Sequence, residues 1–235
     1  MKKTGLFLCC LLIAMLLVGC GAQSSSNTPR LVKQTMIEKN GTTTVTNYEY
    51  NKKGQMIRYE ILSGSNIDTV KEVKYDRNGY KNYEKGTSGT GFITEIYWTN
   101  DKQGRPVSQR VVTDYKGNKT ESVSQFEYTD EYGSYVQTMT SGAATGNTVT
   151  VVKDEHGNEI THAELLGISM RYENTYDGDV LVERTSTQTT PGGLTVTKTK
   201  YEYDENGNLI KETSYDSEGR VTLTQTYEYE IPNGN

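Results

Sequence analysis

The chain has 235 residues, of which 33% are hydrophobic, with a mean hydropathy of −0.71 and a formal net charge of −5 at pH 7. A mildly acidic chain without a run of basic residues is not expected to bind nucleic acid, or to bind anionic lipid through its charge. The low apolar content leaves few residues for an aliphatic core. Tyrosine supplies apolar surface instead, with 18 Tyr against 3 Phe and 1 Trp.

The N-terminus carries a leader-like segment in which Lys2 and Lys3 precede an apolar run from Leu6 to Val18. This run is short for a membrane span and has the length of a signal peptide. It ends in Leu-Val-Gly-Cys, which resembles a bacterial lipoprotein signal and implies cleavage between Gly19 and Cys20 with a diacylglyceryl group on the Cys20 thiol. Two acyl chains would anchor the mature protein to a membrane without spanning it. The alternative is an ordinary secretory leader that ends near a cysteine.

Cysteine usage fits this interpretation. Cys9 and Cys10 lie in the segment that would be removed, and Cys20 would carry lipid, so disulfides and thiolate chemistry are excluded from the folded part. Removal of residues 1 to 19 takes away two lysines and no acids. We expect a signal peptide over residues 1–19, the lipidated cysteine with a flexible tether over 20–30, and a repeat domain over 31–235.

A turn signal, Asp or Asn followed three residues later by Gly, recurs along the chain. The glycines at 54, 79 and 104 are 25 residues apart, those at 133 and 157 are 24 apart, and those at 207 and 219 are 12 apart. A short acceptor at the first position and Gly where φ is positive are typical of tight turns between antiparallel strands. The copies are Asn51 to Gly54, Asp76 to Gly79, Asp101 to Gly104, Asp130 to Gly133, Asp154 to Gly157, Asp204 to Gly207 and Asp216 to Gly219, with a shortened Asp177-Gly178.

Looser turns lie between these copies, so each period leaves about 8 to 9 residues for each strand. Segments such as Thr42 to Tyr50 and Leu194 to Tyr203 are rich in Thr, Val and Tyr, and in the second segment these alternate with Lys and Glu, the pattern of half-buried strands. We predict an all-β fold, an antiparallel meander of repeated β-hairpins that forms a long, twisted and curled single sheet of about 14 to 16 strands. A short helix is the alternative for His162 to Tyr172, although Gly167 disfavours it.

The best copies of the repeat are YEYDENGNL at residues 201 to 209 and YDSEGRV at 215 to 221. They resemble the tyrosine-aspartate (YD) repeat of the Rhs family, and weaker copies cover most of residues 42 to 230. The resemblance implies arrays of hairpins in a curling sheet, which in that family can close into a hollow shell around a toxic passenger domain. The chain differs in its length, and we expect neither a passenger after residue 230 nor the family's terminal core-associated segment.

Pairs of tyrosines two residues apart, at 48 and 50, 201 and 203, and 227 and 229, must share one face of their strand. In one interpretation this ladder is the core, with each ring contributing about 1.5 to 3 kcal/mol. In the other, part of it is exposed and offers flat faces to sugars or to an extended polymer. A second apolar column, three residues after each glycine, is predicted from Ile57, Val107, Val136, Ile160 and Ile210, and Asn82 interrupts it.

Tyr97 and Trp98 are the candidate ligand contacts. Adjacent residues of a strand face opposite ways, so at most one of the two belongs to the core face. Trp98 is the only tryptophan, and it stands outside the tyrosine pattern. We predict that it makes an exposed contact, and the alternative is that it packs under a loop.

Signals for catalysis are few. His156 lies in a turn and His162 lies six residues later, without a third ligand at a typical metal spacing. The acids of the turns lack the spaced oxygen donors of a calcium loop, and no phosphate-binding loop or nucleophile motif is present. We therefore expect no catalytic residue, no metal and no cofactor. Paired carboxylates of the kind that hydrolyse glycosides stay open, because their separation is not set by the sequence.

These observations predict a lipid-anchored binding or scaffold protein on the extracytoplasmic face of a bacterial cell membrane. Its expected partners are the membrane, through Cys20, and a cell-wall polymer, glycan or envelope protein. The alternatives are an envelope hydrolase with carboxylates in the concavity of the sheet, and a partner or immunity component of an Rhs-like toxin. Because the repeat itself is explained by turns and packing, function is expected where the copies deviate, around Gly79 to Trp98, Asp114 to Asn118 and Asp154 to Tyr172.

Overall fold

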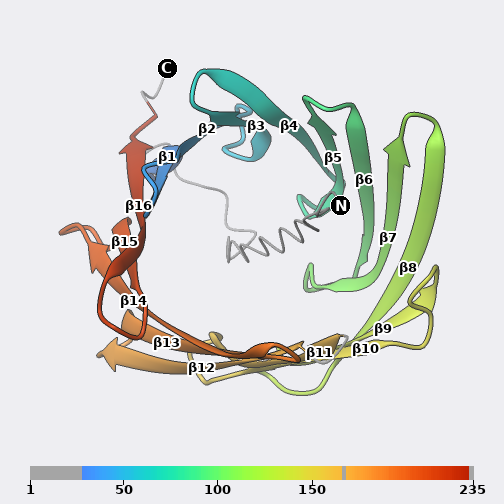
Figure 1. The fold of residues 1–235 in the computed structure, drawn as a ribbon. Helices are drawn as coiled ribbons and strands as arrows, with labels where there is room; N and C mark the ends of the chain where they lie inside the picture. The colour runs from blue at the N-terminus through green and yellow to red at the C-terminus, as the bar shows by residue number, and fades with distance from the viewer. Residues whose placement is uncertain (1–27, 166–167, 233–235) are drawn as a thin grey trace, which may run out of the picture.

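A computed structural model describes residues 28–165 and 168–232, and all regular structure within these ranges is β-strand. Sixteen strands form an antiparallel meander, and β1 also pairs with β16, so the sheet closes into a barrel (Figure 1). The strands are β1 Arg30–Glu38, β2 Thr43–Tyr50, β3 Met56–Ser63, β4 Asn66–Tyr75, β5 Lys81–Ser88, β6 Phe92–Asn100, β7 Pro106–Tyr115, β8 Asn118–Tyr128, β9 Tyr135–Ser141, β10 Thr148–Lys153, β11 Glu159–Leu165, β12 Ile168–Asp177, β13 Val180–Thr190, β14 Gly193–Tyr203, β15 Leu209–Tyr215 and β16 Val221–Glu230.

The predicted all-β antiparallel meander is confirmed, and closure of the sheet corrects its predicted form. The helix considered for His162 to Tyr172 is wrong, because residues 162–165 belong to β11 and residues 168–172 to β12. The predicted signal peptide, Cys20 and most of the tether lie outside the described residues. Among the described residues, no helix is long and apolar enough to cross a membrane.

The turns at Asn51, Asp76, Asp101, Asp154, Asp204 and Asp216 close their hairpins in the same way. In the turn at Asp204 the N–H of Gly207 donates to the Asp204 carbonyl at 3.0 Å, and Asp204 Oδ1 accepts from the N–H groups of Asn206 and Asn208 at 3.0 and 2.8 Å. Gly207 has φ of +80°, a conformation that a Cβ disfavours. The strand after the turn gains an unpaired residue, as in a bulged hairpin. Turn geometry thus accounts for both the Asp and the Gly of the repeat.

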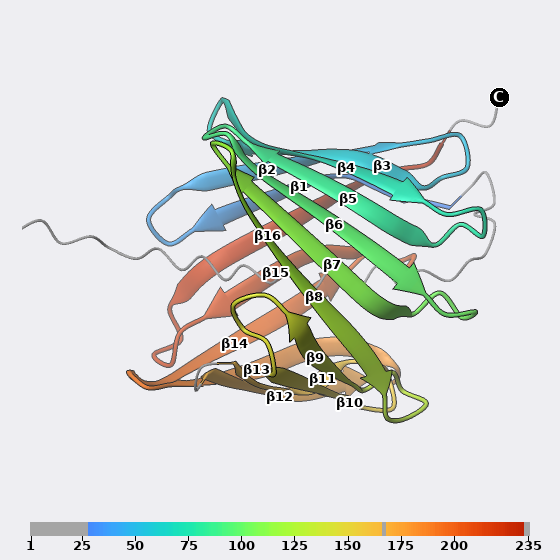
Figure 2. The same cartoon turned by 90° about the vertical axis from the view of Figure 1, so that its right-hand side faces the viewer.

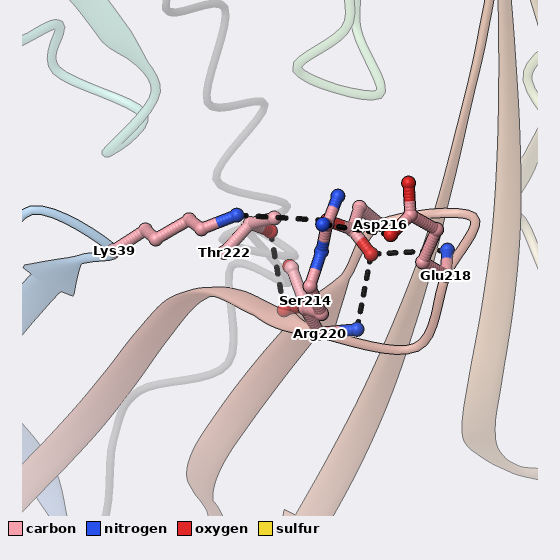
Figure 3. A network of polar contacts seen from close by, with 6 residues as sticks. All are labelled: Lys39, Ser214, Asp216, Glu218, Arg220 and Thr222. Atoms are coloured by element: carbon pink, nitrogen blue, oxygen red, sulfur yellow. Dashed lines mark hydrogen bonds and ion pairs between the residues drawn. The ribbon is translucent and has the colours of Figure 1, made fainter.

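The turns from Asn51 to Asp204 each join an even-numbered strand to the next odd one, so they gather at one end of the barrel, here called the Asp-turn end. The turn at Asp216 joins β15 to β16 at the other end, which explains the half period of the last two copies. This turn helps to close the barrel through Lys39 of the β1–β2 turn. The backbone N–H of Lys39 donates to the Thr222 carbonyl at 2.9 Å. Its Nζ lies 3.7 Å from Asp216 Oδ2, which also pairs with Arg220 (Figure 3).

The chirality of the chain decides which face of the sheet turns inward. Consider a strand that runs upward, seen from the side on which a given side chain points at the observer. For an L-residue, the backbone N–H and C=O of that residue then point to the right. The N–H of Asp76 donates to the Tyr80 carbonyl, on the side of β5. Successive residues of a strand direct their backbone groups to opposite sides, so those of Tyr75 and Val73 point toward β3. Figure 2 shows the barrel wall from outside, with β4, β6 and β8 running to the right and successive strands following downward. In that view β3 lies to the left of β4 once β4 is turned upright, so Tyr75 and Val73 point into the barrel.

The inner face therefore carries the tyrosine pairs and most of the buried residues. Tyr48, Val73 and Glu84 on this face are 7%, 4% and 6% exposed. The outer face carries lysine, glutamate, arginine and threonine, joined across neighbouring strands by ion pairs. These are Lys33–Glu228, Arg58–Glu49, Arg110–Glu121, Lys198–Glu183 and Lys211–Glu202.

A hydrogen bond links successive repeats on the inner face. The last tyrosine of an even-numbered strand, here called the bridging tyrosine, donates its hydroxyl to a backbone carbonyl near the start of the strand that precedes it. Such bonds contribute about 0.5 to 1.5 kcal/mol each. They run from Tyr50 to Leu31, Tyr75 to Met56, Tyr128 to Pro106, Tyr203 to Leu181 and Tyr229 to Leu209, at 2.8 to 3.1 Å.

The predicted second apolar column does not form a core. Ile57 and Ile210 are 37% and 38% exposed. Both are the unpaired residues of the register shifts beside their turns, because Tyr50 pairs with Met56 while Glu49 pairs with Arg58, and the same shift occurs on β15. The extra residue leaves the alternation of the strand, so a constant distance from the glycine does not place it inside.

Candidate functional site

At the Asp-turn end the strands β11 and β12 depart from the bond that the bridging tyrosines make, and they do so differently from β6, where Asn100 Nδ2 donates to the Lys81 carbonyl at 2.9 Å. Glu159 is the first residue of β11, and its carbonyl stands where other repeats have the acceptor of the bridging tyrosine. Here this carbonyl accepts from Asn174 Nδ2 of β12 at 3.2 Å. The bridging tyrosine of this repeat, Tyr176, donates its hydroxyl to Asp154 Oδ2 at 2.6 Å. The carboxylate of a turn therefore replaces a backbone carbonyl as the acceptor.

Asp154 is the centre of a polar network. Its Oδ2 also accepts from Asn174 Nδ2 at 2.9 Å, and its Oδ1 accepts from the N–H groups of His156 and Asn158 at 3.1 and 2.9 Å. Burial alone would raise the pKa of Asp154, but the hydrogen bonds from Tyr176 and Asn174 outweigh it and hold that pKa below its ordinary value. Because its oxygens are already occupied, Asp154 organises the site and is not a free acid or base.

Side chains on either side complete the network. Asn158 Nδ2 donates to the Tyr176 hydroxyl at 2.9 Å, and Arg184 Nε donates to Asn174 Oδ1 at 2.8 Å. Burial, followed by the bond to Asp154, raises the pKa of Tyr176 to about 12, so this hydroxyl is protonated at neutral pH. The ring of His156 stacks on the ring of Tyr176 with centroids 4.1 Å apart and an interplanar angle of 28°.

The strands separate where this network lies. The ladder between β11 and β12 reaches this end only as far as Thr161 and Arg171, whereas β12 continues to Asp177 in partnership with β13. In a regular repeat the corresponding ladder reaches Arg58 and Glu72, and β4 ends at Tyr75. Beyond Arg171, side chains and not backbone bonds join β12 to the turn of β10 and β11.

A cavity of about 800 Å³ occupies this position. Its lining includes inner-face residues of β12, outer-face residues of β11 and β12, and two turns, so it lies in the wall of the barrel at its Asp-turn end. Tyr132 on the neighbouring turn is 44% exposed at its edge. The lining residues are Tyr132, Asp154, Glu155, His156, Ile160, Thr161, Arg171, Tyr172, Glu173, Asn174 and Tyr176.

The structure places the two residues predicted as ligand contacts elsewhere. Tyr97 and Trp98 face opposite ways, as expected from adjacent strand positions. Tyr97 lies on the outer face, 5.1 Å from the ring of Tyr83 and under the guanidinium of Arg110, while Trp98 is half-buried on the inner face with Lys81 Nζ 4.5 Å from its ring. Neither lines the cavity in the wall.

The two histidines are also separated. His156 lines the cavity, whereas His162 lies further along β11, with its Nδ1 3.6 Å from Glu159 Oε2. No group of three or more His, Cys, Asp or Glu side chains within residues 28–165 and 168–232 is arranged to hold a metal ion.

Asn174 and Tyr176 were not singled out from the sequence. The signal was present, because Asn174-Thr175-Tyr176 stands where other copies have Tyr-x-Tyr, so an amide replaces the first ring of the pair. The irregular segment Asp154 to Tyr172, where we expected function, includes the turn that lines the cavity. It ends before Asn174 and Tyr176.

Comparisons with known proteins bear on the fold. No protein-family model matches the chain, and no curated protein matches it. A porin-like protein from Bacteroides uniformis has a similar structure, with a TM-score of 0.55 and 12% identity over 88% of this chain and 98% of that one. At this identity the similarity concerns the fold alone.

Weaker similarities carry no argument about this chain. A porin-like protein from Bacteroides vulgatus has a TM-score of 0.40 at 10% identity, over 85% of this chain and 98% of that one. The TcdB2–TccC3 structure has a TM-score of 0.30 at 15% identity, over 81% of this chain and 10% of that one.

Proposed function

We propose that the chain is a bacterial envelope lipoprotein, anchored through Cys20, whose barrel stands beside the membrane and serves as a binding or scaffold module. The observation that carries this proposal is the division of polarity between the two faces of a closed barrel. The inner face is aromatic, and the outer face bears charged pairs along its strands, among them Arg58–Glu49, Arg110–Glu121 and Lys211–Glu202.

This division is the reverse of that required in a bilayer. A barrel that spans a membrane presents an apolar band outward, and a lysine or arginine at its midplane costs about 2 to 4 kcal/mol. Attachment through lipid on Cys20 is compatible with a charged outer wall, because only the acyl chains enter the bilayer. The fold similarity to a porin-like protein supports an envelope location without requiring the same insertion.

Fractionation of cells that express the wild-type protein and Cys20→Ala tests this proposal. We expect the wild type in the membrane fraction, labelled by radioactive palmitate, and the variant unlabelled and released by washing with carbonate. Circular dichroism of the purified variant provides the folding control. Mass spectrometry shows whether the variant has lost residues 1–19, because a retained apolar leader would itself hold it at the membrane. A Cys20→Ala barrel that lacks the leader and still resists carbonate extraction would show that its strands insert, and the proposal would be abandoned.

One observation favours a second candidate, an envelope hydrolase. Glu212 on the inner face accepts from the Tyr227 hydroxyl at 2.7 Å, and burial raises its pKa above the ordinary value despite this bond. A carboxyl with a raised pKa suits a general acid. Release of reducing ends from cell-wall polymers by the wild type, and its loss in Glu212→Gln with an unchanged melting temperature, would support this candidate; equal activity in both proteins would eliminate it.

A further inference from the structure

We propose that the cavity at β11 and β12, beside the turn that begins at Asp154, is a saccharide-binding site that prefers sugars with free amino groups. This proposal gives a ligand class to the binding function proposed above, but it depends on the cavity and not on the membrane anchor. Its evidence is the combination of aromatic rings, unoccupied polar groups and a negative lining within one cavity of about 800 Å³.

The aromatic part consists of rings from three elements. Tyr132 is 44% exposed on the turn before β9, Tyr172 lies on β12, and His156 on the turn before β11 has one face against Tyr176. A sugar ring presents C–H groups on its flat sides and hydroxyls on its rim, so it fits a site with aromatic faces and a few convergent polar groups. A cavity of this volume accommodates a short oligosaccharide and not a folded domain.

The polar part divides into groups that are occupied and groups that are available. Asp154 and Asn174 are held by the network and fix the wall. Glu155 and Glu173 are available, since their side chains are 77% and 70% exposed and their contacts with His156 and Arg171 are long, at 3.8 Å. A carboxylate accepts hydrogen bonds from sugar hydroxyls and pairs with an ammonium group.

The charge of the lining sets the preference. Asp154, Glu155 and Glu173 stand against one cation of the lining, Arg171. Like charges repel across a partly desolvated site, so phosphorylated and carboxylated saccharides are disfavoured, whereas an amino sugar gains an attraction. Because Glu155 and Glu173 are well exposed, this attraction falls as salt concentration rises.

Isothermal titration of the purified barrel with three oligosaccharides of similar length tests the proposal. The probes are a glucosamine tetramer, an N-acetylglucosamine tetramer and a galacturonate tetramer. We expect the strongest binding for the glucosamine tetramer, weaker and salt-insensitive binding for the N-acetylated one, and none for the galacturonate one. Binding of the galacturonate tetramer as tight as the others, or no binding of any probe at millimolar concentration, would overturn the proposal and leave the membrane anchor unaffected.

Matched variants locate the site. Glu155→Gln/Glu173→Gln should weaken the glucosamine tetramer at least tenfold and leave the N-acetylated tetramer unchanged. The control Glu49→Gln/Glu228→Gln removes the same charge from exposed positions on β2 and β16 and should change neither. Equal weakening by both double variants would mean nonspecific attraction to an acidic protein and would refute the site.

A second pair of variants tests the aromatic contact. Tyr132→Ala should weaken both the glucosamine and the N-acetylated tetramers, whereas Tyr115→Ala, at a tyrosine that is 43% exposed on β7, should weaken neither. Both tyrosines lie at the surface, so both variants are expected to fold, and melting curves verify this. Undiminished binding by Tyr132→Ala would remove the aromatic contact from the proposal and overturn it.

Discussion

The repeat at Asp204 and the repeat at Asp154 have the same turn but different surroundings. At Asp204 the carboxylate serves its own turn, and the bridging tyrosines Tyr203 and Tyr229 bond to backbone carbonyls of the preceding hairpins. At Asp154 the carboxylate also accepts from Tyr176 and Asn174, and a cavity lies beside it. The tyrosine bonds near Asp204 join neighbouring strands of the barrel wall, whereas at Asp154 the tyrosine bonds to the turn and the wall contains a cavity.

The largest effect is expected at Gly104, whose turn packs against the ring of Tyr80 on the neighbouring turn. A Cβ on Gly104, at φ of +82°, would lie 2.5 Å from the ring of Tyr80, whereas a Cβ on Gly157, at φ of +78°, would have nothing within 4 Å. Gly157→Ala should cost about 1 to 2 kcal/mol for the left-handed conformation. Gly104→Ala adds an overpacking cost of about 1 to 3 kcal/mol.

Chemical denaturation of both variants measures this difference in the free energy of unfolding. Equal losses for Gly104→Ala and Gly157→Ala would show that the ring of Tyr80 moves aside without cost, and the proposed overpacking at Gly104 would be wrong.

The bridging tyrosines give the next effect. Tyr203→Phe removes a bond to the Leu181 carbonyl and should cost about 0.5 to 1.5 kcal/mol. Tyr176→Phe removes a bond to a carboxylate and should cost about 1.5 to 3 kcal/mol. Urea titrations compare the two. A larger loss for Tyr203→Phe would mean that the backbone acceptor, and not the carboxylate, is the stronger anchor.

Acid sensitivity separates the two aspartates further. The folded-state pKa of Asp154 lies below its ordinary value, so its contribution to stability is present above the unfolded pKa of about 3.9 and is lost as pH falls through the folded pKa. The melting temperatures of the wild type and Asp154→Asn should therefore converge as pH falls below about 4.

Asp204→Asn is the control for this titration. Asp204 also has a lowered pKa, caused mainly by hydrogen bonds from Asn208 of its own turn. The melting temperature of Asp204→Asn should therefore also approach that of the wild type as pH falls, but the difference between the two at neutral pH should be smaller than for Asp154→Asn. A gap for Asp154→Asn that widens toward low pH would contradict the assignment of Asp154 as the charged centre of the network.

The sequence allowed the regular parts of this structure to be predicted, because they depend on local rules. The Asp and Gly of each turn, the shared face of Tyr48 and Tyr50, and the opposite directions of Tyr97 and Trp98 follow from turn geometry and strand alternation. Closure does not follow, since the bond between Gln34 and Gln225 joins residues 191 apart, and nothing local encodes it. The predicted apolar column was wrong because bulges displace Ile57 and Ile210 from the alternation.

The candidate site was predictable only in part for the same reason. His156 and Asp154 were recognised as turn residues, and deviation from the repeat pointed to their segment. Their partners, Asn174 and Tyr176, follow by 20 and 22 residues, and they lie where β12 continues past the end of its ladder with β11 at Arg171. Pairing between strands, which the sequence leaves unspecified, thus decides which deviant copy becomes a cavity.

The smallest effect tests whether the stacked histidine belongs to the network or only to its surface. His156 and Asn206 occupy the same position of their turns, two residues after the aspartate, and both donate a backbone N–H to it. His156→Ala also removes a stacked ring and should cost about 0.5 to 1.5 kcal/mol. Asn206→Ala removes an exposed side chain and should leave the free energy of unfolding within about 0.5 kcal/mol. Because the turn bond is common to both, any excess loss in His156→Ala measures the stack on Tyr176. Equal values for the two variants would mean that the ring adds nothing to the fold, and the saccharide site would then rest on Tyr132 and Tyr172 as its aromatic faces.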